Sequence, residues 1–463
     1  MLSRLRNDPF YKQICKLMIP IMLQNLLNAA VNSVDVVMLN FVGESAIAAV
    51  SLASQYANVL FMVFYGLGTG ATMLCAQYFG KGDIRAVETV QGIALRFSMG
   101  FAALFALVAV AAPEFMMGIF TNDPELIRLG AGYLRILSVS YLCWGIIEVY
   151  LSVLRSVGRV AIGTILNTVA VGLNVILNAV FISGLFGAPR LGVIGVAIAT
   201  SASRVVELAL CFVVSRRSQN IKLKFSTLFV RNKLLMADFV RLSLPALLND
   251  VVWGVGFSMY SVILGHLSAE AVAANSFANV VRNFGSVLCF GQANAGGILL
   301  GQMIGENRLE EAKQGAKKVL GLTIIGGVLG GLVILGIRPL VLQYADLSTT
   351  AMGYLSTMLL INSYYIIGGA VNTTLIAGVF RAGGDSRFGL ICDILDMWVY
   401  AVPLGFLAAF VLELPVVWVY FLLCTDEFVK WPWVIKHYRS GKWLKNITRE
   451  GLFEAPASGG DAP

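Results

Sequence analysis

The sequence has few charged residues, only two histidines and no nucleotide-binding loop. Charged residues make up 13% of the 463 residues, while 58% are hydrophobic. A soluble globular domain carries about 25% charged residues, so this class of protein is excluded. Neither His266 nor His437 has the spacing of a metal ligand, so the sequence predicts no zinc site. No GxxxxGK[ST] motif occurs, so it predicts no ATP-driven machine, and no motif supports an enzyme.

The seven cysteines are odd in number, scattered along the chain and without a CxxC pair. They lie within or at the ends of apolar runs. A disulfide framework and a redox motif are therefore both excluded, and we expect the cysteines to be small core residues.

Long apolar runs dominate what the sequence does contain. A helix needs about 20 residues to cross a bilayer, and twelve runs reach this length. The first continues too far to be a cleaved signal peptide. The sequence therefore predicts an all-α polytopic membrane protein embedded in the lipid bilayer, with transmembrane helices near 14–40, 49–78, 90–114, 130–154, 160–184, 191–215, 238–266, 272–303, 317–341, 351–378, 387–411 and 414–435.

Lysine and arginine are concentrated in the N-terminal segment, in alternate connectors and in the C-terminal tail. Cytoplasmic loops carry the excess of positive charge, so both termini are predicted to be cytoplasmic, in a plasma or inner membrane. This topology, together with contact to anionic lipids, accounts for the net charge of +8. Nucleic acid is therefore not an expected partner.

The second half of the chain repeats the first at a spacing of 225 residues. Identical residues align: Pro20 with Pro245, Asn58 with Asn283, Gln77 with Gln302, and Gly80 with Gly305. After a one-residue slip, LRSVG at 154–158 aligns with FRAGG at 380–384. Each half has an even number of spans, so the halves form parallel repeats, an architecture of alternating-access transporters. We expect two six-helix lobes, 1–215 and 238–438, a cytoplasmic linker, 216–237, and a disordered cytoplasmic tail, 439–463.

Asp35 is a carboxylate inside the first predicted span, with no lysine or arginine within a helical turn or two. An ionisable group near the bilayer centre costs at least about 2.5 kcal/mol, so it is a functional hypothesis by default. An unpaired carboxylate can take up a proton or hold a cation. We expect Asp35 to couple transport to H⁺ or Na⁺, and a structural role is the alternative.

Asn174 and Asn178 lie one helical turn apart in the fifth predicted span. Their amide oxygens could complete an oxygen cage for Na⁺ around Asp35. Small polar side chains also form hydrogen bonds across helix interfaces in membranes, so a structural role stays open.

Further charged residues in the first-lobe spans include one pair on a single helix face and one glutamate. Arg204 and Glu207 are three residues apart in the sixth span, so we expect them to form an ion pair. Glu148 lies in the fourth span, and the sequence assigns it no role.

Four charged residues of the second-lobe spans are candidates for one network. Asp250 is in the middle of the seventh span, Arg282 is near the same depth in the eighth, and Asp393 and Asp396 are one turn apart in the eleventh. An arginine at this depth requires a carboxylate partner, so one interpretation is a structural ion-pair network. Three carboxylates outnumber one guanidinium, however. We therefore expect these residues to line a substrate cavity and to leave a carboxylate free for a cation.

Several stretches together resemble the multidrug and toxic compound extrusion (MATE) family. They are IPIMLQNLLNAAVNSVDVVMLNFVGESAIAAVS in the first span, AQYFGKGD after the second, LRSVGR after the fourth, LNVILNAVFISGLFGAPRLGVIGVAIAT across the fifth and sixth, and FRAGGDS after the tenth. The resemblance covers residues 10 to 440. It implies twelve helices in two lobes around a V-shaped cavity, and antiport of organic cations and drugs against H⁺ or Na⁺.

The resemblance also carries over to single positions. Asp35 matches the first-span carboxylate that the family uses for cation coupling, and Asn174 matches its fifth-span asparagine. Asn178 stands where many members have an aspartate. Asp250 matches an acidic seventh-span position of many bacterial members, one turn before the glutamate of a Na⁺-coupled branch, where this chain has Trp253. These departures indicate a divergent bacterial branch.

We therefore predict a monomeric secondary antiporter that exports small cationic organic compounds, with H⁺ or Na⁺ as coupling ion and no other cofactor. One alternative is a flippase for lipid-linked precursors, which would need more cationic side chains than the mainly acidic cavity candidates. The other is a non-transporting receptor or scaffold, in which neutralising Asp35 would have no effect.

Overall fold

The computed structural model describes residues 8–40, 42–218, 221–345 and 347–453, with the backbone alone at 29–37, 40, 44, 186 and 225. In these ranges the chain is helical, without a β-strand. The helices of the first half are α2 (Pro9–Asn40), α3 (Glu44–Gly80), α4 (Ile84–Ala111), the short α5 (Pro113–Gly118), α6 (Pro124–Ser156), α7 (Val160–Ser183) and α8 (Gly192–Arg217). Two short 3₁₀ turns lie in the connectors: η1 (Leu185–Gly187) is between α7 and α8, and η2 (Phe225–Phe229) is between α8 and α9.

The second half begins with α9 (Lys233–Leu267), α10 (Ala269–Gly305) and α11 (Leu309–Tyr344). The next two spans contain π-helical segments, which often occur at functional sites. They are α12 (Thr349–Thr373) with η3 (Thr374–Phe380), and α13 (Ser386–Asp393) with η4 (Ile394–Ala401), α14 (Val402–Phe406) and η5 (Leu407–Val411). The last span is broken into α15 (Val416–Leu423), α16 (Asp426–Val429) and α17 (Trp431–Ser440).

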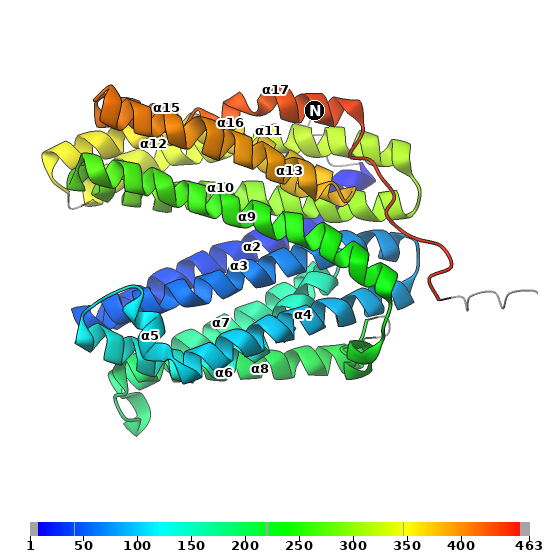
Figure 1. The fold of residues 1–463 in the computed structure, drawn as a ribbon, viewed down its shortest axis with the longest axis horizontal. Helices are drawn as coiled ribbons and strands as arrows, with labels where there is room; N and C mark the ends of the chain where they lie inside the picture. The colour runs from blue at the N-terminus through cyan, green and yellow to red at the C-terminus, as the bar shows by residue number, and fades with distance from the viewer. Residues whose placement is uncertain (1–7, 41, 219–220, 346, 454–463) are drawn as a thin grey trace, which may run out of the picture.

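Ten helices of the described part are long and apolar enough to cross a membrane. α2 and the broken α15–α16 segment occupy the first and twelfth predicted spans. Figure 1 shows two lobes, with α2 to α8 below and α10 to α17 above. The predicted all-α fold of two six-helix lobes is therefore confirmed.

Short polar side chains fix where several helices begin. Asp83 accepts a hydrogen bond from the backbone N–H of Ala86 at the start of α4, at 2.9 Å. Asp123 caps α6 in the same way, ahead of a proline at the first helical position. Ser268 caps α10. Such caps satisfy backbone donors that a helix leaves unpaired, so the connectors determine the helix boundaries.

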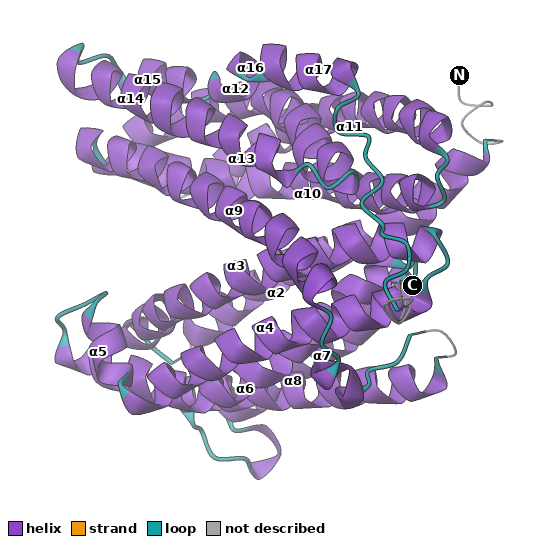
Figure 2. Cartoon of the chain, turned by 45° about the vertical axis from the view of Figure 1, so that its right-hand side comes forward, coloured by secondary structure: helices purple, strands orange, loops and turns teal. Residues whose placement is uncertain are grey.

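The first helix of each half starts against the opposite lobe. Leu17 and Ile21 of α2 are buried in a cluster with residues of α10 and η3. Leu242 and Ala246 of α9 are buried with residues of α3, α4 and α6. These two pairs are separated by the same 225 residues as the sequence repeat. The repeat thus extends to the packing, and the two first helices cross between lobes (Figure 2).

The lobes touch where the C-terminal ends of α3 and α10 cross, a region that we call the closed end. It consists of Gln77, Gly80, Ser156, Gln302, Gly305 and Ala382. A Cβ atom on Gly80 would lie 2.1 Å from the carbonyl oxygen of Gln302, and one on Gly305 would lie 1.9 Å from that of Gln77. Only glycine allows two backbones to approach this closely. Figure 2 shows the two lobes diverging away from this end.

Two equivalent glutamines join the lobes at the closed end. Gln77 Nε2 donates to the carbonyl oxygen of Ala382 at 2.7 Å. Gln302 Nε2 donates to the carbonyl oxygen of Ser156, also at 2.7 Å. The acceptors are themselves equivalent positions, in the LRSVG and FRAGG segments. The contact therefore has the two-fold symmetry of the repeat.

Residues 441–453, which we call the strap, run from the second lobe onto the first across the closed end (red in Figure 1). Gln77 Nε2 donates to the carbonyl oxygen of Lys445 at 3.1 Å, and its Oε1 accepts from the N–H of Ile447 at 2.8 Å. Trp443 is only 1% exposed. The sequence had predicted a disordered tail from residue 439. The strap is ordered because its one fully buried side chain, Trp443, is apolar and because the backbone of Lys445 and Ile447 forms hydrogen bonds with Gln77 of the first lobe.

Candidate substrate cavity and charge networks

A cavity of about 440 Å³ lies between the two lobes. The first lobe contributes residues of α2, α3 and α6, and the second contributes α9, α10, η3, α13 and α16. Aromatic side chains form part of the wall: Phe61, Tyr65, Trp253 and Phe290. A smaller cavity of about 50 Å³ shares several lining residues with it and reaches Ala76 and Ala382 at the closed end. Such a mainly apolar space between two lobes suits a small organic ligand.

The charges that line the large cavity are balanced. Three side chains are basic and three are acidic: Arg155, Arg381 and Lys430, and Asp250, Asp393 and Glu427. The sequence had predicted a mainly acidic cavity, which is wrong because the three basic side chains had not been placed in it. The lining therefore does not select cations by net charge.

Asp250 forms an ion pair with Arg381, at 2.9 Å from Oδ1 to Nη2. The Arg381 side chain is 5% exposed and also donates to Asn249 Oδ1 at 2.8 Å. Asn249 in turn donates to Asp393 Oδ2 at 2.5 Å. A buried guanidinium is tolerated when it is paired and hydrogen-bonded, as here. α9, η3 and α13 are thereby joined in one polar network.

The network continues to Lys430, which is 2% exposed at the junction of α16 and α17. Its Nζ lies 3.3 Å from Asp393, 3.3 Å from Asp396 and 3.2 Å from Glu427. Asp426 accepts a hydrogen bond from Tyr260, at 2.8 Å. Three carboxyl groups thus contact one ammonium in a low-dielectric interior, and Asp426 precedes Glu427 in the chain, so a proton or a further cation would balance the excess of carboxyl groups.

Sequence reasoning missed Lys430 and Glu427 and had placed the lysine on the cytoplasmic side of the last span. Because that span is broken at Lys430, the side chain instead lies inside the lobe. The signal was present in DEFVK at 426–430, where two carboxylates lie one turn before the lysine. Asp393 lines the cavity as predicted, whereas Asp396 is fully buried behind it and is absent from the lining.

Arg282 has no ion pair with any described residue, so the predicted carboxylate partner is wrong. Its guanidinium lies over the ring of Phe257, at 4.6 Å from the centroid, and 5.8 Å from that of Tyr365. Cation–π contacts of this kind stabilise a partly buried guanidinium. Arg282 lines a side pocket of about 60 Å³ that also contacts Glu427, outside the main cavity.

A second, polar cavity of about 360 Å³ lies inside the first lobe. Asn174 lines it and donates to Thr200 Oγ1 at 3.2 Å. Asn178 is fully buried and donates to Asn174 Oδ1 at 3.3 Å, which confirms that the two share one helix face. Asp35 belongs to α2, but its side chain lies outside the described part of the structure. Its predicted proximity to the asparagines stays a prediction.

Two ion pairs border this first-lobe cavity. Arg204 and Glu207 are 2.7 Å apart, so their predicted pairing is confirmed. Glu148, to which the sequence assigned no role, pairs with Arg155 at 2.9 Å. Among the described residues, no group of three or more His, Cys, Asp or Glu side chains is arranged to hold a metal ion.

Comparison with known proteins identifies the family. The MatE family model matches residues 20–180 and 245–407, one segment in each lobe. The chain belongs to the MatE family. This match confirms the predicted resemblance to MATE transporters. The family consists of multi-pass membrane transporters, not of enzymes.

Relatives of this MatE chain align over nearly their whole length. "Probable multidrug resistance protein YoeA" of Bacillus subtilis is 26% identical over 420 residues, covering 88% of this chain and 89% of the relative. "Probable multidrug resistance protein NorM" of Thermotoga maritima is 24% identical over 460 residues, covering 96% of both. A multidrug resistance MATE transporter solved in an outward-facing conformation has a TM-score of 0.83 at 22% identity, over 95% of this chain and 98% of that one.

Proposed function

We propose that this MatE chain is a secondary active antiporter that exports small organic molecules in exchange for H⁺ or Na⁺ by alternating access. The observation that carries the proposal is the cavity of about 440 Å³ between two repeated lobes that meet at the closed end. Relatives named as multidrug resistance proteins support export as the direction. Rocking of the lobes would break the symmetric contacts at the closed end and expose the cavity on that side.

The closed end is assigned to the cytoplasm in this proposal. The connector between the lobes and the strap lie at this end and are rich in lysine and arginine, and the first part of α11 adds Lys313, Lys317 and Lys318. The positive-inside rule then places both termini in the cytoplasm, in the inner membrane of a bacterial cell. The described conformation is accordingly the outward-facing state. A single chain supplies both lobes, so a monomer suffices.

Two regions are candidates for ion coupling. In the first lobe, Asp35 with Asn174 and Asn178 would take up H⁺ or Na⁺. In the second lobe, the excess of carboxyl groups around Lys430 would bind a proton or Na⁺ beside it. A coupling ion changes the conformational equilibrium only if it binds one state more tightly.

The substrate would be a small, partly aromatic molecule, because aromatic rings line much of the cavity. An organic cation would find a counter-charge at Asp250, Asp393 or Glu427. A lipid-linked precursor is the second candidate, and the three basic residues of the lining favour it more than the sequence suggested.

The test is gradient-driven efflux from proteoliposomes loaded with a fluorescent lipophilic cation. We expect export under an imposed Na⁺ or H⁺ gradient, and loss of coupling in Asp35→Asn. Glu310→Gln, an exposed carboxylate at the start of α11, is the matched control and should export normally.

Each outcome distinguishes the candidates. Export without an effect of Asp35→Asn would move the coupling site to the cluster at Lys430. Flux of a fluorescent phosphate-bearing lipid, without flux of any soluble probe, would support the flippase. No flux of either kind under either gradient would refute transport.

A further inference from the structure

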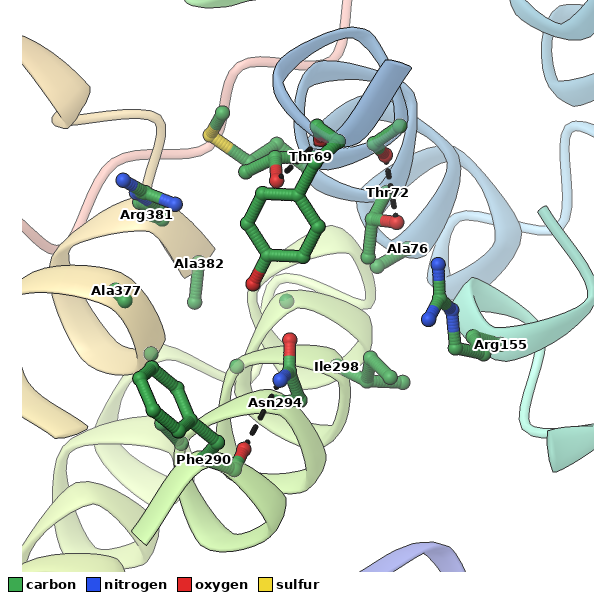
Figure 3. Close-up of a pocket in the computed structure, with 17 residues that line it drawn as sticks. Thr69, Thr72, Ala76, Arg155, Phe290, Asn294, Ile298, Ala377, Arg381 and Ala382 are labelled. Carbon is green, nitrogen blue, oxygen red and sulfur yellow. Dashed lines mark hydrogen bonds between the residues drawn. The ribbon is translucent and has the colours of Figure 1, made fainter. Parts of the chain in front are cut away.

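Two arginines, one from each lobe, line the narrow base of the cavity. Arg155 ends α6 and Arg381 follows η3, at equivalent positions of the LRSVG and FRAGG segments. Figure 3 shows both side chains directed at the small cavity from opposite sides, with Asn294 between them. Among the described residues, no aspartate or glutamate lines the small cavity, in contrast to the larger one. The charged groups that border the base are therefore the two guanidinium groups.

Both guanidinium groups are held in place and still have donors to offer. Arg155 binds Glu148 and Arg381 binds Asp250, each through Nη2 at 2.9 Å. Nη2 of Arg155 donates to Glu148 and Ser152, and Nη2 of Arg381 donates to Asn249 and Asp250, whereas Nε and Nη1 of both arginines have no hydrogen-bond partner in the described part of the chain. A carboxylate thus fixes each guanidinium through Nη2 and leaves single N–H groups as donors for a ligand.

Neutral polar groups complete the base. Tyr65 and Asn294 line both the small and the large cavity and can donate to an oxygen atom. The aromatic ring of Phe290 borders the same two cavities. A ligand with an oxyanion at one end and an apolar or aromatic body at the other matches this arrangement.

We propose that Arg155 and Arg381 form a subsite for an oxyanion, a carboxylate or a phosphate, carried by a transported molecule. The inference rests on the proposed transport function and adds amphipathic organic anions and zwitterions to its substrates. Each arginine can donate a charge-assisted hydrogen bond to the oxyanion, and such bonds are about twice as strong as neutral ones. The aromatic body of the ligand occupies the larger cavity.

The position of the subsite links ligand binding to closure. Ser156 and Ala382, whose carbonyl oxygens accept the hydrogen bonds of the closed end, directly follow Arg155 and Arg381. An oxyanion that contacts both arginines joins the two lobes next to these bonds. Binding of the oxyanion therefore stabilises the contact between the lobes at the closed end.

Calorimetric titration of the purified full-length protein in detergent tests the subsite. The probes have the same ring and differ in charge: phenyl phosphate and benzoate as anions, benzyl alcohol as neutral and benzyltrimethylammonium as cation. We expect the anions to bind roughly 10- to 100-fold more tightly than benzyl alcohol, as charged hydrogen bonds imply.

Two variants remove the recognition without leaving a buried charge unpaired. The double variant Arg155→Gln/Glu148→Gln eliminates one ion pair and keeps the net charge. Arg381→Lys keeps the cation beside Asp250 but loses the Nε–H and Nη1–H donors. Each should weaken phenyl phosphate binding roughly tenfold or more and leave benzyl alcohol unchanged. An unchanged melting temperature shows that the variants are folded, and Arg204→Lys, outside the main cavity, is the control.

Equal affinity for anionic and neutral probes, or anion binding that both variants retain, would overturn the proposal. Phosphatidic acid added in mixed micelles identifies the source of the oxyanion. If phosphatidic acid competes with phenyl phosphate, a lipid headgroup occupies the subsite. If it does not compete, the natural ligand of the subsite is a soluble anion. Anion binding without flux of phenyl phosphate or of any other probe under either gradient would refute the antiporter and keep the subsite. Flux of the cation without anion binding would refute the subsite and keep the antiporter.

Discussion

The closed end makes a quantitative prediction at Gln77. The Gln77→Ala substitution removes three hydrogen bonds, to Ala382 and Lys445 and from Ile447, at 2.7, 3.1 and 2.8 Å. All three join the first lobe to the second lobe or to the strap. A hydrogen bond contributes about 1 kcal/mol net, so the closed conformation should lose about 3 kcal/mol. This free energy changes the ratio of open to closed molecules about 100-fold.

The ratio can be measured by spin-label distances between the lobes at the closed end. Labels at Lys222 and Glu310, both exposed, report on separation in a variant without the native cysteines. Gln302→Ala is the internal control, because it removes one hydrogen bond between the lobes, to the carbonyl oxygen of Ser156, and should change the ratio only about fivefold. Equal distance distributions in Gln77→Ala and the unsubstituted chain would refute the reasoning.

Three further substitutions have defined outcomes. Gly305→Ala places a methyl group 1.9 Å from the carbonyl oxygen of Gln77 and should separate the lobes in the same distance measurement, whereas Gly321→Ala, with no atom within 4 Å, should not. Lys430→Met leaves its carboxylate neighbours without a cation and should cost about 3–5 kcal/mol, with a melting temperature that recovers partly at pH 5. The unsubstituted chain should lose a small part of its stability in acid, and the Asp8→Asn variant should not show this loss. A hydrogen bond from a lysine on α11 holds the pKa of Asp8 below its ordinary value, so its contribution is present at neutral pH and disappears as the pH falls below about 4. Thermal melts between pH 3 and pH 7 measure this difference.

The spans and the repeat could be predicted because they are local or periodic features of the sequence. An apolar run of 20 residues determines a membrane helix by itself, and Gln77 aligns with Gln302 by simple spacing. The Arg204–Glu207 pair was equally accessible, since both residues lie on one helix face. None of these inferences requires knowledge of which helices are neighbours.

The partners of the second-lobe charges could not be predicted because they depend on how distant helices pack. Asp250 was matched with Arg282 on depth alone, but Arg381, 131 residues away, is its partner. Arg282 is stabilised by aromatic rings instead, a contact that depth does not indicate. The break of the last span at Lys430 moves that side chain inside, and an uninterrupted helix would have left it at the surface.

The strap escaped prediction for a related reason. Its composition is polar, which is typical of disordered segments, and its order comes from a few apolar residues and from Gln77 on the other lobe. Contacts of this kind have no local signature in the sequence.

Alternating access is the central claim, and a reversible crosslink at the closed end tests it most directly. A Cβ atom on Gly301 would lie 3.0 Å from the Cβ of Ala76, close to the 3.5–4.5 Å that a disulfide spans. The Ala76→Cys/Gly301→Cys variant, without the native cysteines, should form a bond between the lobes. We predict that oxidation abolishes efflux from proteoliposomes and that a reductant restores it, while each single variant is insensitive. Efflux at the unsubstituted rate through fully crosslinked protein would contradict the account.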